Sequence, residues 1–146
     1  MKYNVSVEIN LPRERVIELF DNPENMKLWQ PSLISFELIE GEAGQPGAKS
    51  KLLHKMGKRE IEMIETIVKR NLPDEFSGTY DAKGVHNIVT AKFVALGPKV
   101  TRYTTEQEFQ FSGFMKLLAF FMPSAFKKQT VKYMNDFKEF AEGKSA

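Results

Sequence analysis

The sequence has no cysteine, only two histidines and a single tryptophan among its 146 residues. Without cysteine no disulfide framework can form, and the absence fits a reducing compartment. Two histidines supply few groups for a histidine-based zinc site or a catalytic triad. We therefore expect a fold that depends on neither disulfides nor metal, and we expect no cofactor.

Neither sign of charge dominates, and long hydrophobic runs are missing. Lysine and arginine number 21 and aspartate and glutamate 19, mixed along the chain, so the formal net charge is +2. Such a chain has no field strong enough to hold a phosphate backbone, and we expect no nucleic-acid partner. The longest apolar stretch, Phe114–Met122, is interrupted only by Lys116 and is about half as long as a bilayer-spanning helix. The N-terminus alternates polar and apolar residues without a signal-peptide pattern, which favours a cytoplasmic location.

Phosphate-binding and nucleophile motifs are also missing. Gly41–Gly47 contains three glycines, but their spacing differs from that of a P-loop or a dinucleotide fingerprint. The segment also connects two strand-like stretches, whereas those motifs connect a strand to a helix. No nucleophile elbow and no cluster of metal ligands occurs in the sequence. These absences favour a binding protein over an enzyme.

Alternating hydrophobicity is the main positive signal. Residues 2–10 alternate with period two, and the pattern returns at Ser32 and continues for roughly eighty residues. Two short helix-like stretches lie between, one ended by Asn22-Pro23 and one ending before Pro31. Gly57-Lys58 is typical of a type II′ turn, and connections this short require antiparallel neighbours. The sequence predicts an antiparallel sheet of six or seven strands, with two short helices after the first strand.

Phe114–Glu142 carries a helical pattern rich in aromatic residues. Phe126, Thr130, Tyr133 and Phe137 recur at spacings of three and four, with lysines on the other side. No later strand-like segment remains to cover this stripe, so the sheet itself must hold the helix. The tyrosine and threonine hydroxyls need partners if they are buried. A long helix that lies across a curved sheet, with polar groups among apolar ones, often encloses a ligand cavity.

Three segments also carry a family resemblance: Val7–Phe20 with Pro23–Pro31, the hairpin around Gly84-Val85, and Thr101–Phe111 with Glu106 and Glu108. Together with the order of elements, they resemble the helix-grip fold of the START-like or SRPBCC superfamily. That superfamily includes polyketide cyclases, lipid-transfer domains and birch-pollen-allergen-like proteins. The resemblance covers almost the whole chain. It implies one α+β domain over residues 1–146, in which a curved antiparallel sheet wraps around the long C-terminal helix.

From this fold we expect a cavity between sheet and helix that binds a small, mostly hydrophobic molecule. The residues predicted to line it are Trp29, Leu52, His54, Met63, Tyr80, Asn87, Phe93, Tyr103, Phe126, Thr130, Tyr133 and Phe137. The tyrosines, His54, Asn87 and Thr130 are the few polar groups that would orient the ligand. The resemblance keeps two other functions open. One is an enzyme similar to the polyketide cyclases and dehydratases, and the other is a partner-binding module resembling the activators of a heat-shock chaperone ATPase.

Two features of the sequence allow more than one interpretation. Glu65 shares its strand phase with Met63 and Ile67, but the opposite phase is equally apolar, so either face can be the inner one. If Glu65 faces the cavity, desolvation would raise its pKa and suit it to proton transfer. Phe114–Met122 is apolar on more than one helical face. This leaves four roles open: a lid, a dimer contact, a contact with a membrane surface, or burial against the two short helices.

Overall fold

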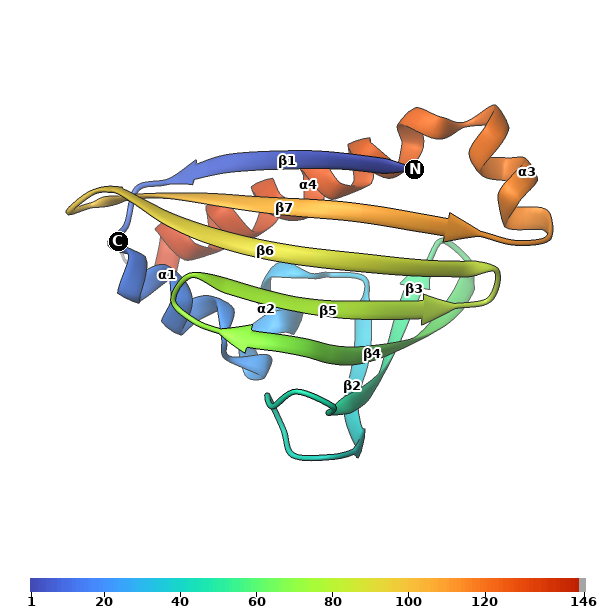
Figure 1. The fold of residues 1–146 in the computed structure, drawn as a ribbon, viewed down its shortest axis with the longest axis horizontal. Helices are drawn as coiled ribbons and strands as arrows, with labels where there is room; N and C mark the ends of the chain where they lie inside the picture. The colour runs from blue at the N-terminus through green and yellow to red at the C-terminus, as the bar shows by residue number, and fades with distance from the viewer. Residues whose placement is uncertain (145–146) are drawn as a thin grey trace.

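The computed structural model describes residues 1–144, and a seven-stranded antiparallel sheet is its main element (Figure 1). The strands are β1 (Lys2–Ile9), β2 (Leu33–Glu40), β3 (Lys49–Met56), β4 (Arg59–Asn71), β5 (Glu75–Ala82), β6 (Val85–Gly97) and β7 (Val100–Phe111). Their order in the sheet is β1-β7-β6-β5-β4-β3-β2, and every neighbouring pair is antiparallel. The predicted sheet is confirmed.

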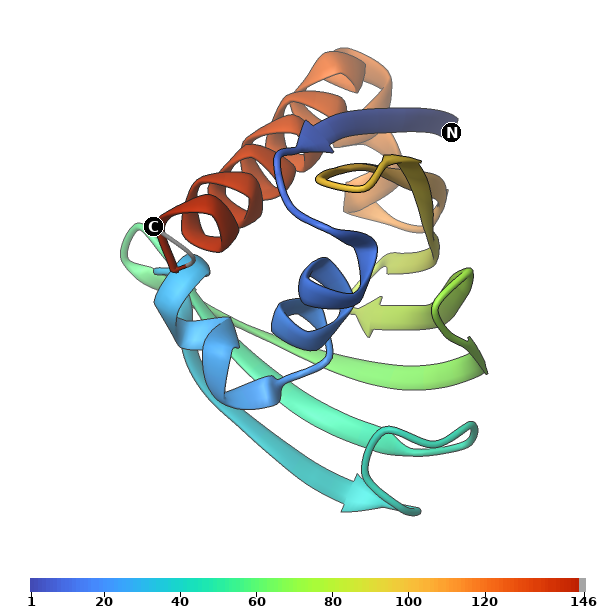
Figure 2. The ribbon, with the colours of Figure 1, turned by 90° about the vertical axis from the view of Figure 1, so that its left-hand side faces the viewer.

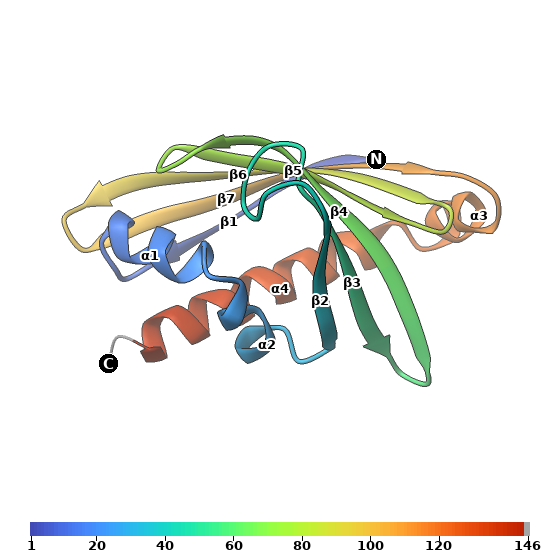
Figure 3. The same cartoon turned by 90° about the horizontal axis from the view of Figure 1, so that it is seen from below.

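The helices lie on the concave side of this sheet and at its two ends. They are α1 (Arg13–Phe20), the 3-10 helix η1 (Pro23–Asn25), α2 (Met26–Trp29), α3 (Phe114–Phe121) and α4 (Pro123–Lys144). The long helix α4 crosses the concave side of the sheet, as Figures 2 and 3 show. Helices α1 and α2 lie at one end of the molecule and α3 at the other (Figures 1 and 3). This arrangement confirms the predicted helix-grip fold.

One stripe of α4 is buried. Met134, Phe137 and Ala141 have almost no exposed surface, and Thr130 is buried one turn earlier. The predicted stripe is therefore present, with Met134 as an additional member. The polar side of the helix is also tied to the sheet, because Lys138 Nζ donates to the Glu8 carbonyl oxygen of β1 at 2.6 Å.

An aromatic core fills the end of the molecule where α1 and α2 lie. The ring of Phe20 packs 5.0 Å from that of Phe93, and Phe93 packs 5.0 Å from Tyr103. Phe137 of α4 joins this cluster at 5.7 Å from Tyr103 and 5.0 Å from Trp29. Burying each aliphatic or phenyl side chain of this size stabilises the fold by about 1.5–3 kcal/mol. This end of the interior is consequently filled by protein.

Two glycines show why the hairpins have their observed form. Gly57 has φ +66°, and Lys58 after it has no positive φ, as the predicted type II′ turn between Met56 and Arg59 requires. Gly84 has φ +78°, and a Cβ there would lie 2.9 Å from Met115 Cγ and 3.0 Å from the Ser112 carbonyl oxygen. The β5–β6 turn therefore needs glycine for its backbone and for its close approach to α3.

Helix α3 is an exposed apolar element. Of its residues only Ala119 is buried, whereas four of its large apolar side chains are exposed. Because α3 lies at the end of the molecule opposite α1 and α2 (Figure 3), the predicted alternative of burial against those two helices is wrong. No helix within residues 1–144 is long and apolar enough to cross a membrane.

Candidate functional site

A row of polar side chains crosses four neighbouring strands. Ser50 of β3 pairs with Glu65 of β4, Glu65 pairs with Tyr80 of β5, and Tyr80 pairs with Asn87 of β6. Directly paired residues on adjacent strands point to the same face of a sheet. Ser50, Glu65, Tyr80 and Asn87 therefore form one line across the sheet, which we call the polar row.

The polar row faces the concave side, where α4 lies. Ser50 and Glu65 are only 4% and 9% exposed. Their neighbours in the opposite phase, Lys51 and Glu62, form an ion pair on the convex face at 3.4 Å, with about half of each side chain exposed. The direction of Glu65, which the sequence pattern could not decide, is therefore inward.

Glu65 and Tyr80 form a hydrogen-bonded pair in this row. Tyr80 donates its hydroxyl hydrogen to Glu65 Oε2 at 2.8 Å. Burial raises the pKa of Glu65 above its usual value, and the hydrogen bond from Tyr80 offsets part of that rise. Burial likewise raises the pKa of Tyr80, and the negative charge of Glu65 raises it further. A carboxyl group with a raised pKa can donate a hydrogen bond or exchange a proton with a bound molecule.

Two further tyrosines reach the same region from other elements. Burial raises the pKa of both Tyr103 on β7 and Tyr133 on α4, and the charge of Glu65 also raises that of Tyr133. Tyr133 nevertheless keeps 36% of its surface exposed, while one side of its ring packs 4.6 Å from Trp29. Tyr133 therefore lies at the border between the concave side and solvent, on α4.

Three hydroxyls on the concave side have no hydrogen-bond partner among the residues that the structure describes: those of Ser50, Tyr103 and Tyr133. Ser50 and Tyr103 are almost completely buried, yet no described polar side-chain atom is both fully buried and unpartnered. The small accessible surface of Ser50 and of Tyr103 must therefore include the hydroxyl oxygen. All three hydroxyls are available to a bound molecule.

An amide network extends the polar row toward β7. Asn87 Nδ2 donates to Gln107 Oε1 at 3.0 Å and to the Glu108 carbonyl oxygen at 3.1 Å. Gln107 Nε2 in turn donates to Thr105 Oγ1 at 2.8 Å. Gln107 and Thr105 were not among the predicted site residues. The period-two alternation that places Tyr103 inward extends to both of them, so the signal was present in the sequence.

His54 lies on the concave side of β3, beyond Leu52. Its Nδ1 is 3.0 Å from Ser32 Oγ, and burial lowers its pKa, which favours the neutral imidazole. The hydroxyl partner holds the ring in place. His54 is therefore a hydrogen-bonding group whose neutral form is favoured, next to Ser32.

The predicted lining residues fall into two groups in the structure. Those with 5% exposure or less are packed in the interior: Trp29, Leu52, Phe93, Tyr103 and Phe137. Those that keep accessible surface are His54, Met63, Tyr80, Asn87, Phe126 and Tyr133. The second group includes Tyr80 and Asn87 of the polar row, whereas the first group, apart from Leu52, belongs to the aromatic core near α1 and α2. Ligand contacts by either group remain predictions.

Thr130 has its hydrogen bonds supplied by the protein. The Tyr3 hydroxyl lies 2.7 Å from Thr130 Oγ1, and the two hydroxyl oxygens lie 3.0 and 3.2 Å from the Phe126 carbonyl oxygen. The two hydroxyl hydrogens can serve two of these three contacts at a time, at least one of them to the Phe126 carbonyl oxygen. The partner that the buried threonine needed comes from β1, and its hydroxyl is already engaged within the fold.

Half-buried aromatic rings line the concave side toward α3. Phe126 of α4 packs 5.3 Å from Phe109 and 4.9 Å from Phe111 of β7, and these two rings stack at 5.6 Å. Phe109 pairs with Asn87 across β6 and β7, so it continues the line of the polar row. Neither Phe109 nor Phe111 was predicted, although both share the phase of Tyr103.

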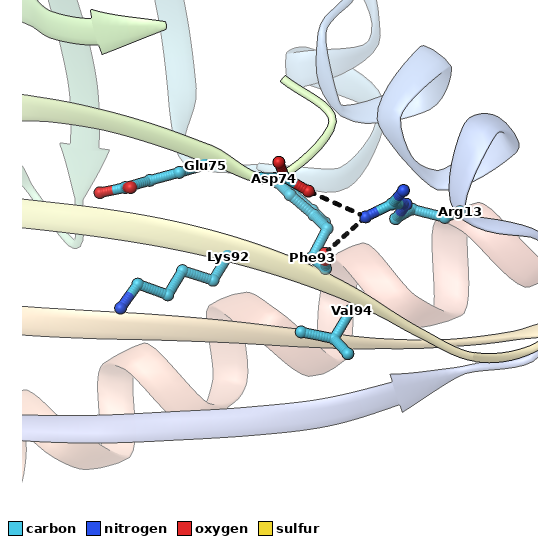
Figure 4. A pocket seen from close by; sticks show the side chains of 6 residues that line it. All are labelled: Arg13, Asp74, Glu75, Lys92, Phe93 and Val94. Carbon is cyan, nitrogen blue, oxygen red and sulfur yellow. Dashed lines mark hydrogen bonds and ion pairs between the residues drawn. The ribbon is translucent and has the colours of Figure 1, made fainter. Parts of the chain in front are cut away.

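A surface hollow of about 390 Å³ lies at the end of the sheet near α1 (Figure 4). Its lining residues are Arg13, Asp74, Glu75, Lys92, Phe93 and Val94. Arg13 donates to Asp74 at 3.1 Å and to the Phe93 carbonyl oxygen at 3.5 Å, and Lys92 pairs with Glu106 at 2.7 Å. The charges of this hollow are already matched by neighbouring residues. It therefore lacks the free polar groups found on the concave side.

No group of three or more metal-ligating side chains occurs within the described part of the chain. The concave side offers a different chemistry: three free hydroxyls, a neutral imidazole and one carboxyl group with a raised pKa. These groups suit hydrogen bonding to a polar atom of a mostly apolar molecule, or a proton transfer to it.

A family model described as polyketide cyclase / dehydrase and lipid transport matches residues 1–142. No curated protein matches the chain. Several solved structures have the same fold. The Zhui aromatase/cyclase from Streptomyces sp. R1128 has a TM-score of 0.80 at 12% identity, over 100% of this chain and 96% of that chain. A START superfamily protein from Mycobacterium smegmatis has a TM-score of 0.78 at 12% identity, over 99% of both chains. A norcoclaurine synthase from Thalictrum flavum has a TM-score of 0.77 at 11% identity, over 100% of this chain and 96% of that chain.

Proposed function

The chain belongs to the polyketide cyclase / dehydrase and lipid transport family, and we propose that it binds and carries a small, mostly hydrophobic molecule. The ligand would lie between the concave face of the sheet and α4. One observation carries the proposal: three hydroxyls on the concave side have no partner among the described residues, and they lie on the same face as a buried carboxyl group. Their oxygens keep some accessible surface, so a bound molecule can supply the hydrogen-bond partners that the protein does not.

The polar groups also indicate what kind of atom the ligand presents. Tyr103 and Tyr133 are phenols with raised pKa values, so they stay protonated and can donate hydrogen bonds. Glu65, where it is protonated, is a donor as well. Donors that converge on one region favour an acceptor oxygen, such as a carbonyl or hydroxyl oxygen. The apolar body of the ligand would then contact Met63 and Phe126.

Native mass spectrometry of the freshly purified protein tests this function. We expect a defined added mass that is present under native conditions and absent under denaturing ones. An environment-sensitive apolar dye should bind saturably, and Tyr133→Phe should weaken the binding of a carbonyl-containing competitor. Tyr3→Phe is the matched control, because the Tyr3 hydroxyl is engaged with Thr130. A protein that retains no small molecule and binds no apolar dye would contradict carriage and favour the partner-binding module.

A second candidate function is acid/base catalysis at Glu65. The observation that favours it is the buried Glu65–Tyr80 pair, in which the carboxyl group has a raised pKa. Two of the similar structures are named as an aromatase/cyclase and a norcoclaurine synthase. If Glu65 transfers a proton, Glu65→Gln should lower turnover by about 10² to 10⁴ with little change in ligand affinity.

The two functions differ in the fate of the ligand. A carrier releases it with its original mass after prolonged incubation, whereas an enzyme converts it. We expect no conversion of the ligand. Glu62→Gln is the control for Glu65→Gln, because Glu62 lies on the convex face of the same strand. Conversion that depends on Glu65 would replace carriage by catalysis.

A further inference from the structure

The exposed face of α3 has a composition unusual for a protein surface. Phe114, Phe120 and Phe121 are 73%, 78% and 70% exposed, and Leu117 between them is 53% exposed. The opposite face of the same helix packs on the protein, because Ala119 is buried and Met115 lies against the β5–β6 turn. One apolar stripe of α3 thus attaches the helix to the fold, and a second faces outward. Contiguous exposed apolar surface of this kind marks an interaction site.

Unpaired positive charge surrounds this apolar face. From Phe109 to Asn135 the sequence contains four lysines and no aspartate or glutamate. Lys132 pairs with Asp136 at 2.6 Å, but Lys116, Lys127 and Lys128 form no ion pair with any residue in the range 1–144. Lys116 belongs to α3, and the other two lie near the start of α4, which follows α3 directly.

The next acidic residue before this segment is also neutralised. Glu108 of β7 pairs with Lys2 at 3.1 Å. The β5–β6 turn, which touches α3, adds an exposed lysine, Lys83. The charged residues near the apolar face are therefore mainly basic, although the chain as a whole is nearly neutral. Asp81, two residues before Lys83, is the acidic exception, and it contacts His86 Nδ1.

We propose that α3 docks this protein on the surface of an anionic lipid membrane. Its phenylalanines would enter the boundary between headgroups and acyl chains while the surrounding lysines contact anionic headgroups. The helix has 8 residues, far fewer than the roughly 20 needed to span a bilayer, so it lies on the membrane without crossing it. Helix α3 projects from one end of the molecule (Figures 1 and 3), so a flat surface can reach it without a clash with the sheet.

The same charges argue against a second copy of this chain as the occupant. A symmetric dimer through α3 would bring the same patch of each copy together. Lys116, Lys127 and Lys128 of one copy would then face their equivalents, and like charges brought together across an interface oppose association. An anionic membrane surface offers apolar acyl chains to the phenylalanines and negative charge to the lysines. This docking does not depend on which molecule the cavity binds.

Vesicle flotation tests the proposal with the intact protein. We expect it to float with vesicles of phosphatidylcholine and phosphatidylserine, to float much less with phosphatidylcholine alone, and to lose binding as salt is added. The double variant Phe120→Ser, Phe121→Ser should lower the bound fraction at least about tenfold, because it removes two large apolar side chains from the inserted face. Both residues are largely exposed, so the fold should remain intact.

Matched controls separate the patch from general surface effects. Leu28→Ser removes an apolar side chain that is 61% exposed on α2, away from α3 (Figure 3), and should leave binding unchanged. Lys127→Glu with Lys128→Glu should abolish the preference for phosphatidylserine, whereas Lys27→Glu with Lys99→Glu has the same charge change far from α3 and should not.

A gain-of-signal variant gives a second measurement. In the variant Phe121→Trp, brominated acyl chains should quench the fluorescence of the introduced side chain. The fluorescence of the buried Trp29 provides a constant background. No flotation with anionic vesicles, unchanged flotation of the Phe120/Phe121 variant, or no quenching would overturn the proposal. Self-association in sedimentation velocity that the same variant abolishes, without vesicle binding, would overturn it in favour of a dimer contact.

Discussion

Replacing Tyr80 with phenylalanine removes one hydroxyl from the concave side of the sheet and keeps the aromatic ring. Glu65 Oε2 then loses its donor at 2.8 Å. Because Glu65 is only 9% exposed, water has little access to take the place of that donor. Hydrogen bonds to charged groups contribute about 1.5–3 kcal/mol. We expect Tyr80→Phe to lower the free energy of unfolding by about that amount where Glu65 is ionised, and by less where it is protonated.

The pH dependence of this loss follows from the direction of the pKa shift. Burial raises the pKa of Glu65 above 4.5, so the folded state binds the proton more tightly than the unfolded state does. The stability that Glu65 contributes is therefore fully present below about pH 4.5 and is lost as the pH rises through the folded pKa. The hydrogen bond from Tyr80 lowers that pKa. Tyr80→Phe should raise it further and widen the range of pH over which stability falls.

Urea denaturation over a series of pH values measures both effects. The four proteins to compare are the wild type, Tyr80→Phe, Glu65→Gln and the double variant, which form a double-mutant cycle. Glu65→Gln should flatten the pH dependence of the wild type in the acidic range, whereas Glu62→Gln on the convex face should not. The ¹³C chemical shift of the Glu65 carboxyl carbon reports its pKa directly.

The Glu65–Tyr80 interaction would be refuted by either of two results. One is a Tyr80→Phe variant that is as stable as the wild type at a pH where Glu65 is ionised. The other is a Glu65 pKa that falls when the tyrosine hydroxyl is removed. Either result would mean that the Tyr80 hydroxyl does not donate a hydrogen bond to Glu65 when the protein is in solution.

Three further substitutions test the packing around the site. Phe137→Ala should lower the free energy of unfolding by about 3–5 kcal/mol because it leaves a space in the core. Glu139→Ala, at an exposed position of the same helix, should change it by less than about 0.5 kcal/mol. Equal urea midpoints for the two variants would contradict this prediction. Tyr133→Phe should leave the stability of the protein nearly unchanged, because the Tyr133 hydroxyl has no partner in the described chain. Tyr3→Phe should lower the free energy of unfolding by about 1 kcal/mol, because the Tyr3 hydroxyl is engaged with Thr130. A larger loss of stability in Tyr133→Phe than in Tyr3→Phe would disprove the assignment of free hydroxyls. Gly84→Ala should cost about 1–3 kcal/mol in thermal unfolding because its φ is +78°, and a neutral effect would contradict the strained turn.

The fold could be predicted from local patterns because the sequence signal of each helix and strand lies within a few residues. The alternation in β3 and β4 and the Gly57-Lys58 turn between them suffice to predict that hairpin, and the structure has it in the expected register, with Met56 opposite Arg59. The stripe of α4 repeats over several turns, so it too is visible without knowledge of its partners. Phase and turn chemistry are properties of short segments.

The polar row could not be predicted, because it depends on register among strands that are far apart in the sequence. Ser50, Glu65, Tyr80 and Asn87 meet only because successive hairpins have particular lengths. The register between β4 and β5 also shifts between Ile67 and Lys69, and no local sequence pattern predicts that irregularity. Both faces of β4 are apolar, so even the direction of Glu65 required the neighbouring strands.

The division between core and accessible residues also depends on distant packing. Phe93 and Tyr103 share the concave face with Tyr80, yet the ring of Phe20 from α1 covers Phe93 and Tyr103. Thr130 is engaged by Tyr3, a residue on the first strand. Periodicity identifies which residues face inward, but the volumes of side chains from other elements decide which of those remain accessible.

The pairing of β1 with β7 has a consequence for how the chain reaches this structure. Lys2 pairs with Glu108 and Ile9 with Thr101, so β1, the first strand of this sheet to be synthesised, has no partner until β7, the last strand of the sheet, emerges. Contacts this distant in sequence slow folding relative to helical proteins of similar size. Until β7 arrives, both β1 and the outer edge of β6 present unpaired backbone groups that other nascent chains can capture. Refolding should therefore succeed in dilute solution and lose yield to aggregation as the protein concentration rises.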